Sequence, residues 1–132
     1  MGAAIDLINS QWSKLTGDQQ SVLSLMKTIN VIPGKKGGIS SKTFVFDFGF
    51  ERGIKGQSVA WTASDIAHDS LHIRQYFRMG EGSRGPDAMR RESEATQFQI
   101  KVGRTLGLSK HEIQVLREYA AHPERYWPEE NR

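Results

Sequence analysis

The chain has 132 residues, no cysteine and a formal net charge of +3 at pH 7. This length fits one domain with one modest core, and the lack of cysteine excludes disulfides and thiolate metal sites, so a bound metal needs His, Asp or Glu ligands. Because no apolar run approaches the roughly 18–20 residues of a membrane span and residues 1–10 lack a signal-peptide pattern, we expect a protein without a membrane span that is cytoplasmic or secreted by a specialised system.

The first half of the chain changes from helical to extended patterns. Residues 4–29 carry apolar side chains at helical spacing, interrupted at Gly17-Asp18, which predicts two helices or one helix with a break. Residues 33–38 have the Pro, Gly and Lys composition of a loop. Residues 43–48 are rich in β-forming side chains and predict a strand, and residues 57–62 predict a second strand that completes a β-hairpin.

Helices are predicted for most of the second half. A long helix follows a cap at Thr62 or Ser64 and runs to about Met79, and a second helix runs from Asp87 to about Leu106. A last helix follows a serine cap and precedes the C-terminal tail. The sequence therefore predicts an α+β fold that is mainly helical, with a β-hairpin or small sheet before a central helix.

The whole chain, residues 1–132, is expected to form a single domain. Residues 1–32 supply N-terminal helices, residues 43–106 form the core around the central helix, and residues 107–132 add a C-terminal helix and tail. The chain has no internal repeat and no low-complexity segment that would argue for further units.

The central helix carries the most informative motif, His68-Asp69-Ser70-Leu71-His72. Two histidines four residues apart project from one helix face, one turn apart, so both imidazoles can reach one tetrahedral ion at about 2.0–2.1 Å. The next residue after the first histidine lies roughly 100° around the helix, where a carboxylate can act as acid and base without being a ligand. A helical projection gathers the polar side chains of this helix on one face: Asp65, His68, Asp69, His72 and Tyr76.

A candidate third ligand lies on the following helix, in Glu92-Ser93-Glu94-Ala95. Glu92 lies near the edge of the apolar stripe of that helix, whereas Glu94 points well away from it. The projection thus turns Glu92, and not Glu94, toward the interior of the fold.

These motifs resemble a minimal gluzincin-type metallopeptidase, in particular the small zincin-like domains at the C-termini of bacterial polymorphic toxins and secretion-system effectors. Such domains often carry His-Glu-x-x-His and then a short helix with Glu-x-x-Ala or Glu-x-Glu-Ala, and the resemblance covers roughly residues 43–106. It implies that His68, His72 and Glu92 bind Zn²⁺ in a hydrolase that acts on a protein or peptide. Glu92 is the third ligand by this resemblance because it begins the Glu-x-x-Ala pattern and faces inward, and Glu94 is the second candidate. It also implies that a cognate immunity protein is a partner if the chain is a toxin.

Asp69 stands where that family has its general-base glutamate. Aspartate is one methylene shorter, so its carboxylate falls about 1–1.5 Å short of the usual position. A misplacement of about 1 Å can cost on the order of a hundredfold in rate. Three outcomes therefore stay open for Asp69 as the catalytic residue: a closer helix compensates, the enzyme is weak, or the site binds metal without hydrolysis.

Other functions are compatible with the same residues. Basic side chains around the central helices favour a module that binds nucleic acid through its phosphates; they are Lys35, Lys36, Arg74, Arg78, Arg84, Arg90 and Arg91. A metal-dependent nuclease would use the histidines on a phosphodiester. In a protein-interaction module the histidine pair would be incidental, since two histidines at this spacing also occur by chance on exposed helix faces.

Overall fold

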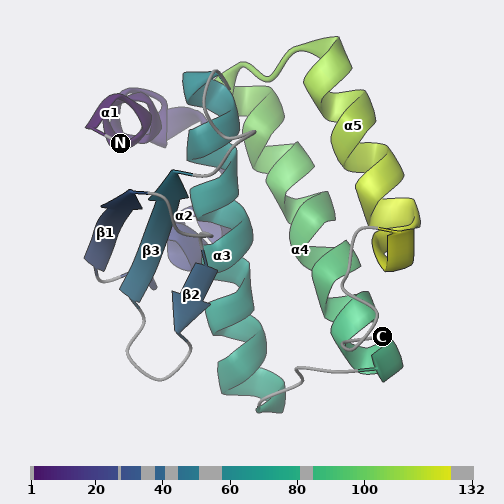
Figure 1. Ribbon diagram of the computed structural model, residues 1–132. Helices are drawn as coiled ribbons and strands as arrows, with labels where there is room; N and C mark the ends of the chain where they lie inside the picture. The colour runs from purple at the N-terminus through teal and green to yellow at the C-terminus, as the bar shows by residue number, and fades with distance from the viewer. Residues whose placement is uncertain are drawn as a thin grey trace.

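The computed structural model describes the backbone of residues 2–26, 28–33, 38–40, 45–50, 58–80 and 85–125, and the side chains of residues 2–26, 58–80 and 85–124. Its helices are α1 (Gly2–Ser10), α2 (Gly17–Leu23), α3 (Val59–Met79), α4 (Gly85–Leu106) and α5 (Lys110–Ala121), with short 3-10 turns η1 (Trp12–Lys14) and η2 (Pro123–Arg125). Three strands, β1 (Thr28–Pro33), β2 (Gly38–Ser40) and β3 (Val45–Phe50), lie between α2 and α3 along the chain (Figure 1).

Helix α3 is the centre of the fold. It contacts α1 and α2 on one side and packs along α4 on the other, and α5 packs on α4 (Figure 1). The main core joins α1, α2, α3 and α4, and a smaller core joins α3, α4 and α5. Burial of these apolar faces supplies most of the stability of such a bundle. Helices α1 and α2 cover one side of the α3–α4 pair and α5 covers the other. Polar side chains between α3 and α4 are therefore shielded from water.

The helix starts follow from their capping residues. Thr16 and Ser109 each form a capping box, with Gln19 and Glu112 respectively, at the starts of α2 and α5. Ser58 Oγ accepts a hydrogen bond from the backbone N–H of Trp61 at the start of α3. As predicted, two helices lie within the first 29 residues and three more helices follow. The interruption covers residues 11–16 rather than Gly17-Asp18, which begin α2, and α3 begins several residues before the predicted cap.

The predicted β-hairpin is wrong, and with it the α+β fold class. Residues 57–62 were expected to form its second strand, but Ser58 caps α3 and Val59 begins that helix. Wherever side chains are described, the chain is mainly helical and contains no strand. Val59 and Trp61 favour strands only weakly in isolation, and the serine cap together with burial of Ala63 against the helical core outweighs that preference.

The three strands do not rebuild the predicted hairpin. β3 pairs in parallel with β1 and antiparallel with β2, in the order β1-β3-β2, so no strand from residues 57–62 takes part. Figure 1 shows them on the opposite side of α3 from α5. Most of the loop predicted at residues 33–38, and the end of the tail after residue 125, lie outside the described residues.

Candidate metal centre

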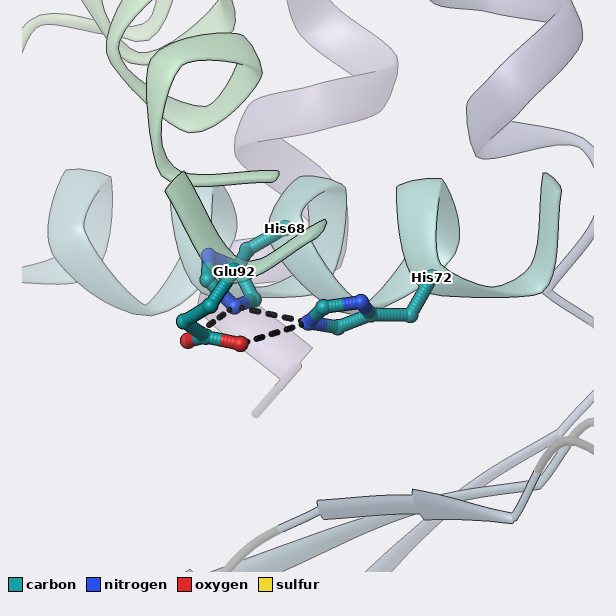
Figure 2. A group of neighbouring side chains, drawn as sticks. All are labelled: His68, His72 and Glu92. Atoms are coloured by element: carbon teal, nitrogen blue, oxygen red, sulfur yellow. Dashed lines mark hydrogen bonds and ion pairs between the residues drawn. The ribbon is translucent and has the colours of Figure 1, made fainter. Parts of the chain in front are cut away.

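Helices α3 and α4 bring the three predicted metal ligands into one cluster. His68 and His72 project from consecutive turns of α3, and Glu92 points toward both of them from α4 (Figure 2). His68 Nε2 lies 2.9 Å from Glu92 Oε1, and His72 Nε2 lies 3.0 Å from Glu92 Oε2. The two histidine Nε2 atoms lie 3.1 Å apart. The two histidine Nε2 atoms and the two carboxylate oxygens of Glu92, all of them atom types that bind metals in proteins, therefore lie close together.

The orientation of the His68 ring follows from a chain of hydrogen bonds. Ser64 Oγ donates to the carbonyl of Trp61 at 2.7 Å, so it accepts from Gln99 Nε2 at 3.1 Å. This leaves Gln99 Oε1 as the atom that faces His68 Nδ1, at 3.0 Å. Because an amide oxygen only accepts, His68 Nδ1 carries a proton, and in the neutral ring the lone pair on Nε2 therefore faces Glu92.

A second glutamine orients His72 in the same way. Gln75 Nε2 donates to the carbonyl of Arg91 at 2.9 Å, so the amide oxygen of Gln75 faces the ring. His72 Nδ1 lies 2.7 Å from Gln75 Oε1 and donates to it. When neutral, both histidines thus point the lone pair of Nε2 inward, which is the arrangement in which a second hydrogen bond fixes a metal-ligating imidazole.

The inward-facing atoms are acceptors, and this sets the electrostatics of the cluster. Two imidazole lone pairs and a carboxylate at these distances repel one another unless protons or a cation lie between them. Among the described side chains that contact the cluster, Tyr119 contributes a donor, its hydroxyl lying 3.0 Å from Glu92 Oε1. That bond satisfies one lone pair of Glu92 and leaves the point between the three side chains suited to a positive charge.

The pKa values of the three groups reflect the same arrangement. Burial alone would raise the pKa of Glu92, but the hydrogen bonds and charges of His68 and His72 outweigh it and hold that pKa well below its usual range. Burial would lower the pKa of each histidine, yet the hydrogen bond and charge of Glu92 raise it above the ordinary value of 6.5. Glu92 therefore stays ionised, and the histidines bind protons readily when no metal competes.

Two further carboxylates, Asp65 and Asp69, lie on the same face of α3. Burial raises the pKa of Asp69 well above its ordinary value, and the charge of Asp65 adds to the shift. Burial also raises the pKa of Asp65, with a smaller opposing effect from His68. The predicted catalytic residue, Asp69, is thus a buried acid beside the cluster rather than one of its three members.

A cavity of about 280 Å³ opens beside the cluster between α3, α4 and α5. His68 and Glu92 lie on its wall, and the other lining residues are Trp61, Asp65, Gln99, Val115, Leu116 and Tyr119. Asp69 is not among the lining residues. Sequence reasoning therefore named the cluster but missed Asp65 as the carboxylate that faces the cavity.

Glu94, the second candidate for the third ligand, lies apart from the cluster. It is exposed, and its Oε1 lies 3.3 Å from Gln75 Nε2. The structure thus places Glu92, and not Glu94, with the two histidines. Gln75, Gln99 and Tyr119 gave no motif of their own, although Gln99 lies two helical turns after Glu92 on α4, which is the spacing of residues on one face.

Two of the predicted basic residues are paired with carboxylates in the described part of the chain. Arg74 Nη1 lies 2.7 Å from Asp18 Oδ1, and Arg91 Nε lies 2.9 Å from Asp87 Oδ2. Lys35, Lys36 and Arg84, which completed the predicted basic surface, lie outside the described residues. No described helix is long and apolar enough to cross a membrane.

Comparisons with known proteins assign the chain to no family. No family model matches it, and neither a curated protein nor a solved structure does. The functional argument therefore depends on the geometry of the cluster and the cavity.

Proposed function

We propose that His68, His72 and Glu92 bind a zinc ion and that the chain is a zinc-dependent hydrolase. The observation that carries the proposal is the cluster of inward-facing acceptors with both histidines oriented by glutamines. Metal-ligand bonds of about 2.0–2.1 Å in a tetrahedron separate the ligand atoms by about 3.3–3.4 Å. The separations here are 2.9 Å from His68 Nε2 to Glu92 Oε1, 3.0 Å from His72 Nε2 to Glu92 Oε2 and 3.1 Å between the two Nε2 atoms. Each of these contacts must lengthen by a few tenths of an ångström to accommodate zinc.

Three protein ligands and an adjoining cavity are the parts that a catalytic zinc site needs. Structural zinc sites use four protein ligands, whereas catalytic sites use three and keep one position open. Among the described residues the cluster has three members, and two of them line the cavity. Zinc bound there would supply a Lewis acid that polarises a carbonyl or phosphoryl oxygen.

Asp65 is the carboxylate best placed for proton transfer at this site. It lines the cavity with His68 and Glu92, and burial raises its pKa toward the range in which an acid-base group works. Asp69 would act from beside the cluster, since it does not line the cavity. A peptide substrate and a toxin or effector context are part of the proposal because of the resemblance of the pentad and the Glu92-containing helix to zincin-like domains.

A metal site without hydrolysis is the second candidate function. The cluster joins α3 to α4 and is largely buried, with His68 only 7% exposed. A zinc ion bound there would stabilise the contact between α3 and α4, whether or not it also took part in catalysis. Loss of zinc that lowers stability, with no hydrolysis by the loaded protein, would favour this alternative.

Metal content tests the proposal directly. The untagged protein, loaded with zinc and dialysed, is expected to hold one zinc ion per chain by elemental analysis, and His68→Ala, His72→Ala and Glu92→Gln are expected to lose it. His111→Ala and Glu94→Gln are matched controls, because His111 is exposed on α5 and Glu94 is exposed on α4. Zinc content that is equally low in the unmodified protein and all variants would overturn the metal site.

Hydrolysis is tested with the loaded protein on fluorescein-labelled casein. Cleavage that disappears on chelation and returns with zinc, and that Glu92→Gln removes, would support the hydrolase. Full zinc occupancy without cleavage of casein or of small acyl esters and amides would contradict the hydrolase and support a metal site without hydrolysis.

A further inference from the structure

We infer that the cavity beside the cluster binds an uncharged aromatic or branched aliphatic group of a small ligand whose polar end lies at His68 and Glu92. The inference rests on the proposed function for the polar end of the ligand, and on the cavity itself for the apolar end. The substrate class that we infer is a carbonyl compound with an apolar substituent, rather than a phosphodiester.

The walls of the cavity combine polar and apolar side chains. The polar lining residues are Asp65, His68, Glu92 and Gln99, and the Tyr119 hydroxyl bonds to Glu92. Side chains from α3 and α5 form the apolar part: Trp61, Val115, Leu116 and the ring of Tyr119. Ligand sites commonly combine a mostly apolar wall with a few polar groups that fix orientation. Val115 is 44% exposed and marks the side of the cavity that is open to solvent.

The charge of the lining residues selects against anionic ligands. Two carboxylates line the cavity, and no lysine or arginine does so among the residues that the structure describes. Sites for phosphate groups are built from arginine, lysine or clustered backbone N–H groups. A phosphodiester would therefore depend on the bound zinc for a cationic partner beside Asp65, whereas an ester or amide carries no charge that needs one.

The size of the cavity limits the apolar group. Its volume of about 280 Å³ lies just below the usual range of about 300–1,000 Å³ for ligand sites. A dry cavity of roughly 150 Å³ can hold benzene. The space is therefore sufficient for one phenyl or isobutyl group together with its linking atoms.

Two zinc-chelating hydroxamic acids that differ in one group provide the test. Benzohydroxamic acid is expected to bind the zinc-loaded protein at least about tenfold more tightly than acetohydroxamic acid, because the phenyl group is buried. Val115→Trp, which fills the open side, is expected to reduce the ratio below about threefold. Val59→Trp is the matched control, since Val59 is 46% exposed and does not line the cavity.

The outcomes separate the cavity from the metal site. If zinc is bound and the two hydroxamic acids bind equally, the inference about the cavity is overturned while the metal site stands. If no zinc is bound, saturation-transfer NMR with benzamide and acetamide tests the cavity alone. Binding of benzamide that Val115→Trp abolishes would then support the cavity, and the absence of benzamide binding would overturn it. Inorganic phosphate that competes with benzohydroxamic acid at similar concentration would overturn the selection against anions.

Discussion

Gln99 and His68 are joined by a hydrogen bond of 3.0 Å whose direction is set by the rest of the chain. Gln99 Nε2 donates to Ser64 Oγ at 3.1 Å, which turns the amide oxygen toward His68 Nδ1. Both side chains are buried, so an unpaired polar atom at either position would be costly. The glutamine thus selects the His68 tautomer in which Nε2 has its lone pair available.

Replacing Gln99 by methionine is expected to weaken zinc binding by about 10- to 100-fold, which is the usual effect of removing a residue that orients a metal ligand. Methionine has a similar volume but no oxygen to accept from Nδ1. Zinc affinity is measured by competition with a chelating dye. Gln97→Met is the control, because Gln97 is an exposed residue of the same helix. An affinity within about threefold of the unmodified protein would contradict the role of Gln99.

Zinc affinity is expected to fall as the pH falls, and to start falling above pH 6.5. Zinc binds the neutral imidazole, so protons compete with it. The hydrogen bond and charge of Glu92 outweigh burial and raise the pKa of His68 and His72 above 6.5. Once both histidines are protonated in the free protein, affinity should drop by up to about a hundredfold per pH unit, since two protons are displaced. Titration calorimetry in buffers of different ionisation enthalpy measures the protons released.

The metal-free protein should show the opposite trend in stability. A histidine whose pKa is raised by folding stabilises the fold below its ordinary pKa, and this contribution is lost as the pH rises through the folded value. The lowered pKa of Glu92 adds stability above its ordinary value of 4.5 that is lost only in stronger acid. The melting temperature of the metal-free protein is therefore expected to fall from about pH 6 to about pH 8, while the increment added by zinc grows. An increment that is independent of pH would argue against the histidines as ligands.

The helical part of the fold could be predicted because its signals are local. Ser109 caps α5 as predicted, and apolar side chains at helical spacing marked the other helices, although Ser58 rather than Thr62 or Ser64 caps α3. The error at residues 57–62 arose because Val59 and Trp61 have strand-forming side chains. Their helical conformation depends on tertiary burial of neighbouring alanines, which no local pattern records.

The candidate site was predictable in part for a similar reason. The i,i+4 spacing places His68 and His72 together whatever the rest of the fold does. The approach of Glu92 depends on how α4 packs against α3, and the sequence signals for it were its position near the apolar stripe and the Glu-x-x-Ala pattern. The contribution of α5 to the cavity, through Val115 and Tyr119, required the tertiary structure.

Gly103 is expected to be sensitive to substitution because α4 passes close to the turn that follows it. A Cβ at this position would overlap the side chain of Leu108 and touch Ser64. Gly103→Ala gains helix propensity of about 1 kcal/mol but must displace a buried leucine, which typically costs about 1–3 kcal/mol. Thermal unfolding should therefore show a lower melting temperature. Gly17→Ala is the control, as nothing lies within 4 Å of the Cβ it would add, and an equal response of both variants would contradict the close packing.

Substitution of Asp69 is expected to change mainly the stability of the protein, whereas substitution of Asp65 is expected to change mainly its hydrolytic activity. Burial and the charge of Asp65 raise the pKa of Asp69, so its stabilising contribution is complete below the ordinary value of 3.8 and is lost as the pH rises through the folded value. At neutral pH the ionised form is unfavourable, and Asp69→Asn should raise the melting temperature by about 3–5 °C for each kcal/mol relieved. The gain should shrink as the pH falls through 3.8 and vanish below about pH 3, where the acid is protonated in both states.

Asp65→Asn is expected to lower hydrolysis by about 10²–10⁴-fold, the usual contribution of a general acid-base group, with zinc content unchanged. Asp69→Asn should retain both zinc and most of the hydrolysis, because Asp69 does not line the cavity. Both variants remove a buried carboxylate from the same face of α3, so each controls for the effect of the other on folding and zinc. The reverse pattern, with hydrolysis lost in Asp69→Asn and kept in Asp65→Asn, would restore Asp69 as the catalytic residue.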